Sequence, residues 1–296
     1  MIVVVTGANG LVGSRLCVAL VRMGANVRAV VRRPGMAPSV DGVTEQVGDF
    51  ADASFAAAVL AGADGAISTV HPMASDGEVQ RRVGVVGTTT FTRAAAAAGV
   101  QRFVHVSTAA VYDRSPTAGD VDEFSALVGD GAGDYSVTKR DADLAIGTVD
   151  GLTRILLRPP AILGSGDTSV WNALRPAEIR DKPAARHAVP EQTFAWVHVD
   201  DLVAFAADIA TARVATSINP AIGPVQNACT PVNVAAGPAT VRDYYETVTR
   251  AVGVTPVWES SEAWAGRLLA ERAHGWGWTP AVGLAEALEE IASGLR

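Results

Sequence analysis

Short apolar runs alternate with helix-like segments along the first half of this 296-residue chain. Continuous Val, Ile and Leu runs separated by helices are typical of a parallel sheet that is covered on both faces. The alternation therefore predicts a doubly wound α/β fold. We expect strands at residues 2–6, 26–33, 43–49, 65–71, 102–108 and 153–162, and helices at residues 11–24, 53–62, 78–98 and 135–148.

A glycine-rich turn follows the first expected strand. The segment TGANGLVG places Gly7, Gly10 and Gly13 between that strand and the first helix. Glycines at these points permit a tight turn, close approach of backbone N–H groups to a pyrophosphate and close packing of the helix on the strand. The helix N-terminus adds partial positive charge. The turn therefore predicts a dinucleotide-binding domain of the Rossmann type.

The end of the second strand indicates which nicotinamide cofactor is bound. A site that prefers NAD carries a carboxylate there, whereas a 2′-phosphate requires arginine. The position expected for the acid is Val31, and Arg32 and Arg33 follow it. We therefore favour NADP(H) over NAD(H), although two arginines that end a strand in solvent fit the same pattern. Asp49 and Phe50 are candidates for the adenine pocket, unless Asp49 only starts a helix.

The segment YSVTK contains one of the two lysines of the chain, Lys139; the other is Lys182. Residues four apart on a helix share a face, so Tyr135 and Lys139 are expected to project together. A nearby ammonium stabilises a phenolate and lowers the pKa of a tyrosine toward a useful range. Thr108, at the end of the fifth strand, is a candidate to steady the substrate oxygen, or else an ordinary helix cap.

Charge and residue spacing exclude several other functions. The formal net charge of −7 argues against a nucleic acid or an anionic membrane as partner. The two cysteines and five histidines lack metal-ligand spacing, so we predict no metal site and read Cys17 as a buried thiol. No apolar run reaches the roughly 18 residues of a membrane helix, and the opening residues do not resemble a signal peptide. We therefore expect a cytoplasmic protein.

The regular alternation ends near Gly164, beyond which the chain is richer in Pro, Trp and charged residues. We assign residues 1–163 to the dinucleotide-binding domain, to which the chain returns at about 195–240. Residues 164–194 and 241–296 are expected to form a smaller substrate-binding lobe. Four tryptophans are candidate walls of its pocket, although a small aromatic core is the more common role. They are Trp171, Trp258, Trp264 and Trp276.

Seven segments resemble, in their order, the motifs of the extended short-chain dehydrogenase/reductase family, of the NAD-dependent epimerase/dehydratase type. They are TGANGLVG, GDF, STAAVYD, YSVTK, LRPPAILGSGD, WVHVDDL and GWTPAVGLAEALEEI. The resemblance implies that Tyr135 is the acid–base, that Lys139 is its partner and that Thr108 completes a triad. The cofactor-binding residues that we expect are Gly7, Asn9, Gly10, Leu11, Val12, Gly13, Arg32, Arg33, Asp49, Phe50, Thr69, His71, Ser107, Tyr135, Lys139, Arg158, Pro159 and Ala161.

Four positions depart from the family pattern. Gly84 stands where relatives usually carry Asn, and Pro72 alters the floor near the nicotinamide. Ala109 and Ala110 follow Thr108, where sugar-nucleotide dehydratases carry Asp-Glu. Without those two carboxylates, elimination of water is not expected.

Three functions are compatible with these features. The first is an NADP(H)-dependent oxidoreductase that interconverts a ketone and a secondary alcohol, with a small molecule as its partner. The second is an NDP-sugar epimerase with tightly bound NAD, in which Arg175, Arg180 and Arg186 bind the diphosphate or else form a solvated face. The third is a non-catalytic NADP-sensing protein. The resemblance also implies a homodimer formed through the helices at residues 78–98 and 135–148.

Overall fold

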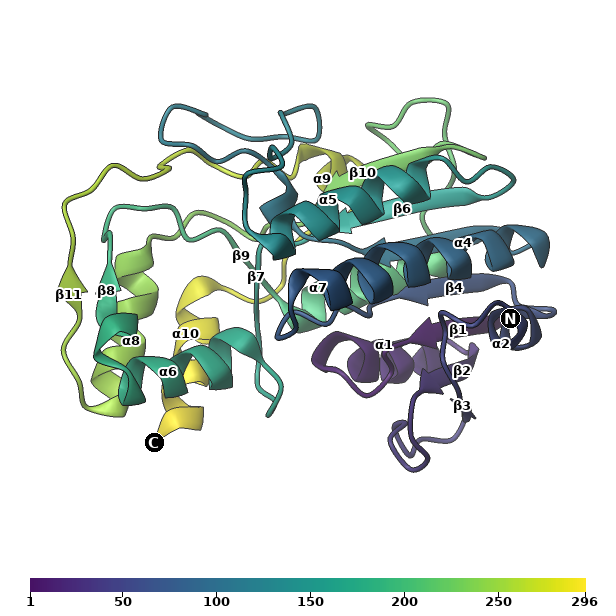
Figure 1. The fold of residues 1–296 in the computed structure, drawn as a ribbon, viewed down its shortest axis with the longest axis horizontal. Helices are drawn as coiled ribbons and strands as arrows, with labels where there is room; N and C mark the ends of the chain where they lie inside the picture. Colours follow the sequence, from purple (N-terminus) through teal and green to yellow (C-terminus); the bar gives the residue numbers. More distant parts are fainter.

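A seven-stranded parallel sheet forms the centre of the computed structural model, which describes residues 1–296. Its strand order is β10-β6-β5-β4-β1-β2-β3, and all neighbours pair in parallel. The strands are β1 (Ile2–Thr6), β2 (Asn26–Val31), β3 (Val43–Val47), β4 (Gly65–Ser68), β5 (Arg102–Val106), β6 (Thr153–Arg158) and β10 (Cys229–Asn233). The predicted doubly wound α/β fold is confirmed (Figure 1).

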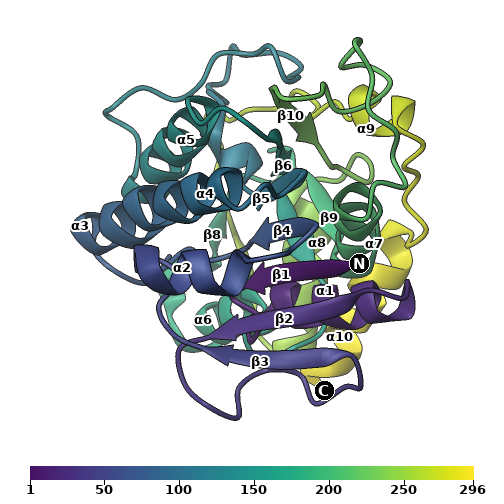
Figure 2. The same cartoon turned by 90° about the vertical axis from the view of Figure 1, so that its right-hand side faces the viewer.

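Helices cover both faces of the sheet because its strands are apolar on both sides (Figure 2). In β1, Val3 and Val5 join the core beneath helices α1 (Leu11–Arg22) and α7 (Val199–Ala210). Val4 points the other way, into a second core. That core lies beneath helices α2 (Ala53–Leu60), α4 (Thr88–Ala97) and α5 (Asp134–Gly147).

The expected helix at residues 78–98 is not a single regular helix. It comprises α3 (Gly77–Gln80), a π-helical stretch η1 (Arg81–Gly87) and α4. A π-helix widens the helical turn and is often found at functional sites. The widened stretch packs against α5, so the irregularity lies beside the helix that carries Tyr135.

The strands end earlier than the sequence pattern predicts. β2, for example, ends at Val31 rather than at residue 33, and β4 ends at Ser68 rather than at residue 71. The residues beyond these ends form loops at the carboxyl edge of the sheet, where open α/β folds place their ligands.

A smaller lobe lies beside the sheet and has its own core, which contains Phe194, Tyr244 and Ile291 (Figure 1). Its segments are β7 (Ala161–Leu163), η3 (Val170–Leu174), α6 (Arg175–Asp181), η4 (Pro183–Arg186), β8 (His187–Ala188), β9 (Trp196–His198), α8 (Val241–Val252), β11 (Val257–Trp258) and α10 (Leu284–Leu295).

The segment between β11 and α10 packs mainly against the sheet domain, although we expected it in the lobe. Trp264, Ala273 and Trp276 belong to the sheet core, and helix α9 (Glu271–Gly275) lies within this segment. Trp276 packs on Phe205 of α7. None of the helices combines the length and apolar character needed to cross a bilayer.

Candidate active site

The glycine-rich turn is shaped by contacts that only glycine allows. Gly7 has φ +68°, and a Cβ there would lie 2.5 Å from the Thr69 hydroxyl oxygen, which itself donates to the Thr6 carbonyl at 2.7 Å. A Cβ at Gly13 would collide with the Gly7 carbonyl. Gly10 caps α1 without a side-chain bond, and the first turn has no acidic residue. The free N–H groups and helix dipole therefore suit a pyrophosphate.

A cavity of about 360 Å³ opens at the N-terminus of α1. Arg15 crosses its rim, bonding Asp200 Oδ1 and the Ser165 carbonyl oxygen at 2.7 Å each. The contact joins α1 to the loop after β7, so both segments enclose the cavity. The lining residues are Asn9, Gly10, Leu11, Ser14, Arg15, Ser165, Gly166, Asp167 and Thr168. The sequence pattern predicted only the first three of these. Ser14 and Arg15 follow them on α1, and the last four approach the turn only through the fold.

Arg32 and Arg33 lie exposed beyond β2, and neither forms an ion pair. The carboxylate of Glu45, on the neighbouring strand β3, forms no ion pair with them and is bonded to other groups. It accepts three backbone N–H groups, from Gly35, Met36 and Ala37, at 2.9–3.0 Å. These bonds hold the pKa of Glu45 below its ordinary value. Both guanidinium groups therefore remain available to an anion.

The two residues expected at the adenine differ in exposure. Phe50 is buried and packs edge-on against Phe91 of α4, with ring centroids 6.1 Å apart. Its side chain is therefore part of the core beneath α4, and its contact with an adenine stays a prediction. Asp49 is exposed and accepts the Ala51 N–H at 2.9 Å, whereas Asp52 caps α2.

Thr108, Tyr135 and Lys139 converge at the carboxyl edge of β5. Thr108 follows that strand, and its hydroxyl oxygen accepts the Ala110 N–H at 3.1 Å. Tyr135 opens α5, and a hydrogen bond with Thr108 reaches its phenol. Lys139, one turn later and 3% exposed, donates to the Val106 carbonyl oxygen at 2.9 Å.

The predicted effect of Lys139 on Tyr135 is not found. Burial raises the pKa of the phenol above its ordinary value, while Thr108 and the Arg114 guanidinium lower it less. Lys139 does not contribute, because its ammonium points to the backbone of β5. Burial also lowers the pKa of Lys139 to about 8, against the opposing charge of Asp143.

The side chain of Arg158, one of the expected cofactor-binding residues, is held by other residues of the protein. Its Nε donates to Asp143 Oδ2 at 2.9 Å and its Nη1 to the Tyr112 hydroxyl at 2.8 Å. Both members of the ion pair are buried. Tyr112 in turn donates to Asn233 at 2.8 Å. The network joins α5 to β6 and β10 beneath the site, and only the backbone of Arg158 remains for a ligand.

His71 explains the departure at Gly84. A Cβ on Gly84 would lie 2.6 Å from Nδ1 of His71, so the imidazole occupies the space beside the glycine. The His71 ring meets the Tyr135 ring edge-on at 5.2 Å, and its Nε2 bonds Gln80 Oε1 at 3.1 Å. Burial, followed by the charge of Lys139, lowers the pKa of His71 to about 3. The imidazole is therefore neutral at physiological pH.

The other expected cofactor residues line the same edge of the sheet. Ser107 is buried directly after β5, and its hydroxyl interacts with the Asp143 carboxylate. The Pro159 carbonyl accepts the Ala109 N–H at 2.8 Å, and Ala161 donates to the Ala195 carbonyl at 3.2 Å. Val12 is half-buried in α1, behind the turn.

The arginines suggested for a diphosphate are already engaged. Arg175 bonds Glu178 and the Tyr245 hydroxyl, at 3.3 and 2.8 Å. Arg180 pairs with Asp181 at 2.8 Å, and Arg186 donates to two backbone carbonyls. All three side chains therefore already have partners within the lobe.

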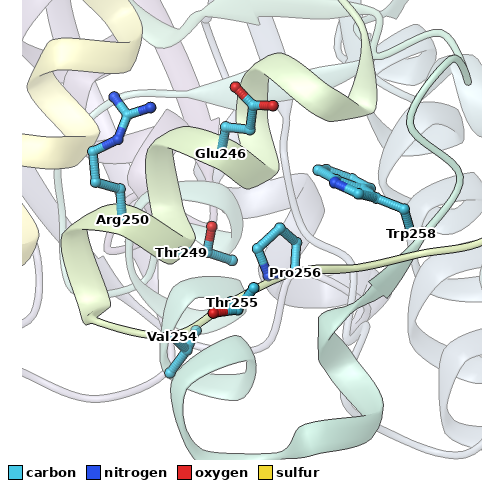
Figure 3. Close-up of a pocket in the computed structure, with 7 residues that line it drawn as sticks. All are labelled: Glu246, Thr249, Arg250, Val254, Thr255, Pro256 and Trp258. Carbon is cyan, nitrogen blue, oxygen red and sulfur yellow. The ribbon is translucent and has the colours of Figure 1, made fainter.

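The lobe contains a second cavity of about 400 Å³, outlined in Figure 3 by Glu246, Arg250 and Trp258, among others. It lies between α8 and the segment leading to β11, and includes none of the expected site residues. Trp171 packs on Phe194 and Tyr244, in the lobe core. Cys17 is buried, which raises its pKa to about 12. No cluster of His, Cys, Asp or Glu is arranged to hold a metal ion.

The sheet order and the glycine cradle define a dinucleotide-binding α/β protein. A family model described as NAD(P)H-binding matches residues 7–211. The chain belongs to this NAD(P)H-binding family. A nicotinamide dinucleotide is thus its cofactor class.

Two curated relatives align with about three fifths of the chain. A 4-hydroxy-2-methyl-3-oxo-4-farnesyl-3,4-dihydroquinoline-1-oxide ketoreductase of Stigmatella aurantiaca is 34% identical over 200 residues, covering 65% of this chain and 56% of the relative. A 3 beta-hydroxysteroid dehydrogenase/Delta 5-->4-isomerase of Mycobacterium tuberculosis is 32% identical over 191 residues, covering 58% and 50%. The chain therefore spans about half the length of the curated relatives it matches.

Solved structures match the whole fold. A UDP-glucose 4-epimerase of Thermotoga maritima superposes with a TM-score of 0.77 over 100% of this chain and 99% of its own, at 17% sequence identity. At that identity the likeness concerns the fold, which includes the small lobe.

Proposed function

We propose that this protein is an NADP(H)-dependent oxidoreductase that interconverts a ketone and a secondary alcohol. The observation that carries the proposal is the convergence of Thr108, Tyr135 and Lys139 at the carboxyl edge of β5, where α/β folds bind ligands. The ketoreductase and hydroxysteroid dehydrogenase relatives support the same reaction class.

The protonation of the site favours delivery of a proton to a carbonyl oxygen. When bound, the cofactor supplies or accepts the hydride. Tyr135 keeps its proton at neutral pH because burial raises the pKa of its phenol. Thr108 steadies the substrate oxygen with its hydroxyl. Lys139, with a pKa of about 8, is mostly protonated at pH 7 and lies one helical turn from Tyr135.

The preference for NADP(H) rests on Arg32 and Arg33. Their exposed, unpaired guanidinium groups follow β2, where the 2′-substituent of the adenosine ribose lies in this fold. We expect NADPH to bind more tightly than NADH, and the double substitution Arg32→Ser/Arg33→Ser to weaken NADPH binding roughly 10-fold or more. Titration of cofactor fluorescence measures both affinities.

Turnover tests the reaction itself. A panel of ketones and secondary alcohols is assayed with NADPH and NADP⁺, with NADH and NAD⁺ alongside. We expect reduction of at least one ketone, faster with NADPH. Inversion of a UDP-sugar without net change in the cofactor would instead establish the epimerase alternative, and cofactor binding without any turnover would establish the sensor.

A further inference from the structure

The imidazole of His71 packs against the ring of Tyr135 at the candidate site. The two ring centroids lie 5.2 Å apart and the ring planes meet at 81°, which is the edge-to-face arrangement that aromatic rings favour. Tyr135 is the second residue of α5, and a helical side chain normally lies over the turn that precedes it. No such turn exists this early in the helix. The Tyr135 ring therefore depends on other segments for support, and His71, from the loop after β4, supplies it.

Hydrogen bonds fix the imidazole of His71 in this orientation. Its Nε2 lies 3.1 Å from Gln80 Oε1 and 3.4 Å from the hydroxyl oxygen of Thr138, which is on the same helix as Tyr135. The amide nitrogen of Gln80 donates to the Ser75 carbonyl at 2.8 Å, so Oε1 is the atom that accepts from the imidazole. The network therefore places the imidazole proton on Nε2, and it ties the end of α3 to the start of α5 through one ring.

His71 acts on Tyr135 by its shape rather than by charge. Burial lowers the pKa of His71 to about 3, so the ring is neutral at physiological pH. Its Nδ1 is buried without a hydrogen-bond partner beside Gly84, where the absence of a Cβ leaves room for the ring. The charged groups that influence the phenol are instead Arg114 and Asp143. The imidazole therefore neither exchanges a proton with the phenol nor stabilises a phenolate; it restricts where the Tyr135 ring lies.

We propose that His71 is a positioning residue: its imidazole, held by Gln80 and Thr138, keeps the Tyr135 hydroxyl directed at the substrate oxygen. The inference rests on the proposed function. Proton transfer requires hydrogen-bond distance between the phenol and that oxygen, and misplacement by about 1 Å can cost roughly 100-fold in rate. His71 thereby affects kcat without itself taking part in the proton transfer.

The kinetic test compares His71→Ala with His71→Phe. Alanine removes the ring, whereas phenylalanine keeps an aromatic ring beside Tyr135 and loses only the hydrogen bonds. With NADPH at saturation, we expect His71→Ala to lower kcat for ketone reduction roughly 10- to 100-fold, and His71→Phe to recover most of that loss. An unchanged kcat in His71→Ala, or equal losses in the two variants, overturns the proposal. An unchanged kcat together with weaker NADPH binding would make His71 a cofactor contact instead.

A further variant and a control separate positioning from folding. Gln80→Leu leaves the imidazole in place but removes the acceptor that orients it, so we expect a smaller loss, roughly 3- to 10-fold in kcat. His274 is exposed and stacks on Trp278, with ring centroids 5.7 Å apart. His274→Ala therefore removes an imidazole with a comparable aromatic contact outside the candidate site, and it should retain the wild-type kcat. Thermal unfolding shows that each variant is folded at the assay temperature. A wild-type kcat in Gln80→Leu overturns the orienting role.

Ionisation of Tyr135 provides a measurement that needs no turnover, so it separates this inference from the proposed function. Tyrosinate absorbance of the cofactor-free protein is followed as the pH is raised, and the curve of the matching Tyr135→Phe protein is subtracted. Burial raises the pKa of Tyr135, and loss of the imidazole admits water to the ring. Tyr135 should therefore ionise at lower pH in His71→Ala than in wild type or His71→Phe. This result supports the contact even if no ketone is reduced; identical curves for wild type and His71→Ala overturn it even if reduction occurs.

Discussion

Lys139 and Lys182, the two lysines of the chain, occupy opposite environments. Lys182 is exposed on the surface of the lobe and pairs with Glu178 at 3.0 Å. Lys139 is buried under α5, and its ammonium donates to the Val106 carbonyl at 2.9 Å. Burial favours its neutral form, whereas the Asp143 charge favours its ammonium form. The fold therefore holds this side chain close to the point at which it loses its proton.

This state of Lys139 predicts a dependence of stability on pH. The pKa in the folded protein is about 8, below its ordinary value of 10.5, so between these pH values the unfolded chain binds a proton that the folded protein lacks. The free energy of unfolding of wild type should therefore rise across this window relative to that of Lys139→Met, by up to about 3 kcal/mol. Urea unfolding from pH 7 to 10.5 measures it, with Lys182→Met as control. Parallel curves for wild type and Lys139→Met would contradict the burial argument.

The π-helical stretch η1 brings its own residues close to the site. Gly84 lies within η1 and faces the imidazole of His71, which follows β4 and meets Tyr135. The glycine and the histidine therefore fit each other across two elements. A larger residue at position 84 and an imidazole at position 71 cannot both occupy this space without a shift.

The close contact between Gly84 and His71 predicts that Gly84→Ala lowers the stability of the protein. The new Cβ would lie 2.6 Å from His71 Nδ1, and displacing the ring should destabilise the protein by about 1–3 kcal/mol. Gly147→Ala is the matched control, since a Cβ there meets nothing within 4 Å. Thermal unfolding of both variants, and of Gly84→Ala combined with His71→Ala, separates the contact from helix propensity. Equal effects of Gly84→Ala with and without His71 would rule the contact out.

Local pattern was sufficient to predict the elements, whereas the contacts between them required the structure. The strands were predictable because buried parallel strands are apolar throughout. Where the predicted strands ran too long, the extra residues, such as Arg32 and Thr108, lie in loops. The pair formed by Asp143 and Arg158 and the stacking of Arg114 on Trp264 join residues from separate elements. No local periodicity encodes such contacts. The burial of Lys139 also depends on contacts between elements, so it was not predicted from the sequence.

At the scale of the whole molecule, the candidate site lies between the sheet edge and the segments that return from the lobe. Arg15 ties α1 to the loop after β7, and Trp264 belongs to the sheet core while supporting Arg114. The outer surface beside the site exposes apolar side chains to solvent. Val86 of η1 and Leu144 of α5 are 58% and 55% exposed, although both are apolar.

This exposed pair agrees with the expected two-fold association, and we propose that η1 and α5 form a homodimer seam. Val86→Glu combined with Leu144→Glu places four like charges in a symmetric interface and should convert the dimer to a monomer. Light scattering after size-exclusion chromatography measures the mass, and Ile218→Glu, at a fully exposed residue between α7 and β10, serves as control. A monomeric wild type, or a double variant that stays dimeric, contradicts the seam.

Proton transfer by Tyr135 is tested most directly by Tyr135→Phe, with kcat and cofactor affinity measured on the same preparation. Phenylalanine keeps the ring that packs on His71 and removes the hydroxyl alone. The account predicts that kcat for ketone reduction falls roughly 10²- to 10⁴-fold, while NADPH binds almost as in wild type. A variant that retains the wild-type kcat would contradict it.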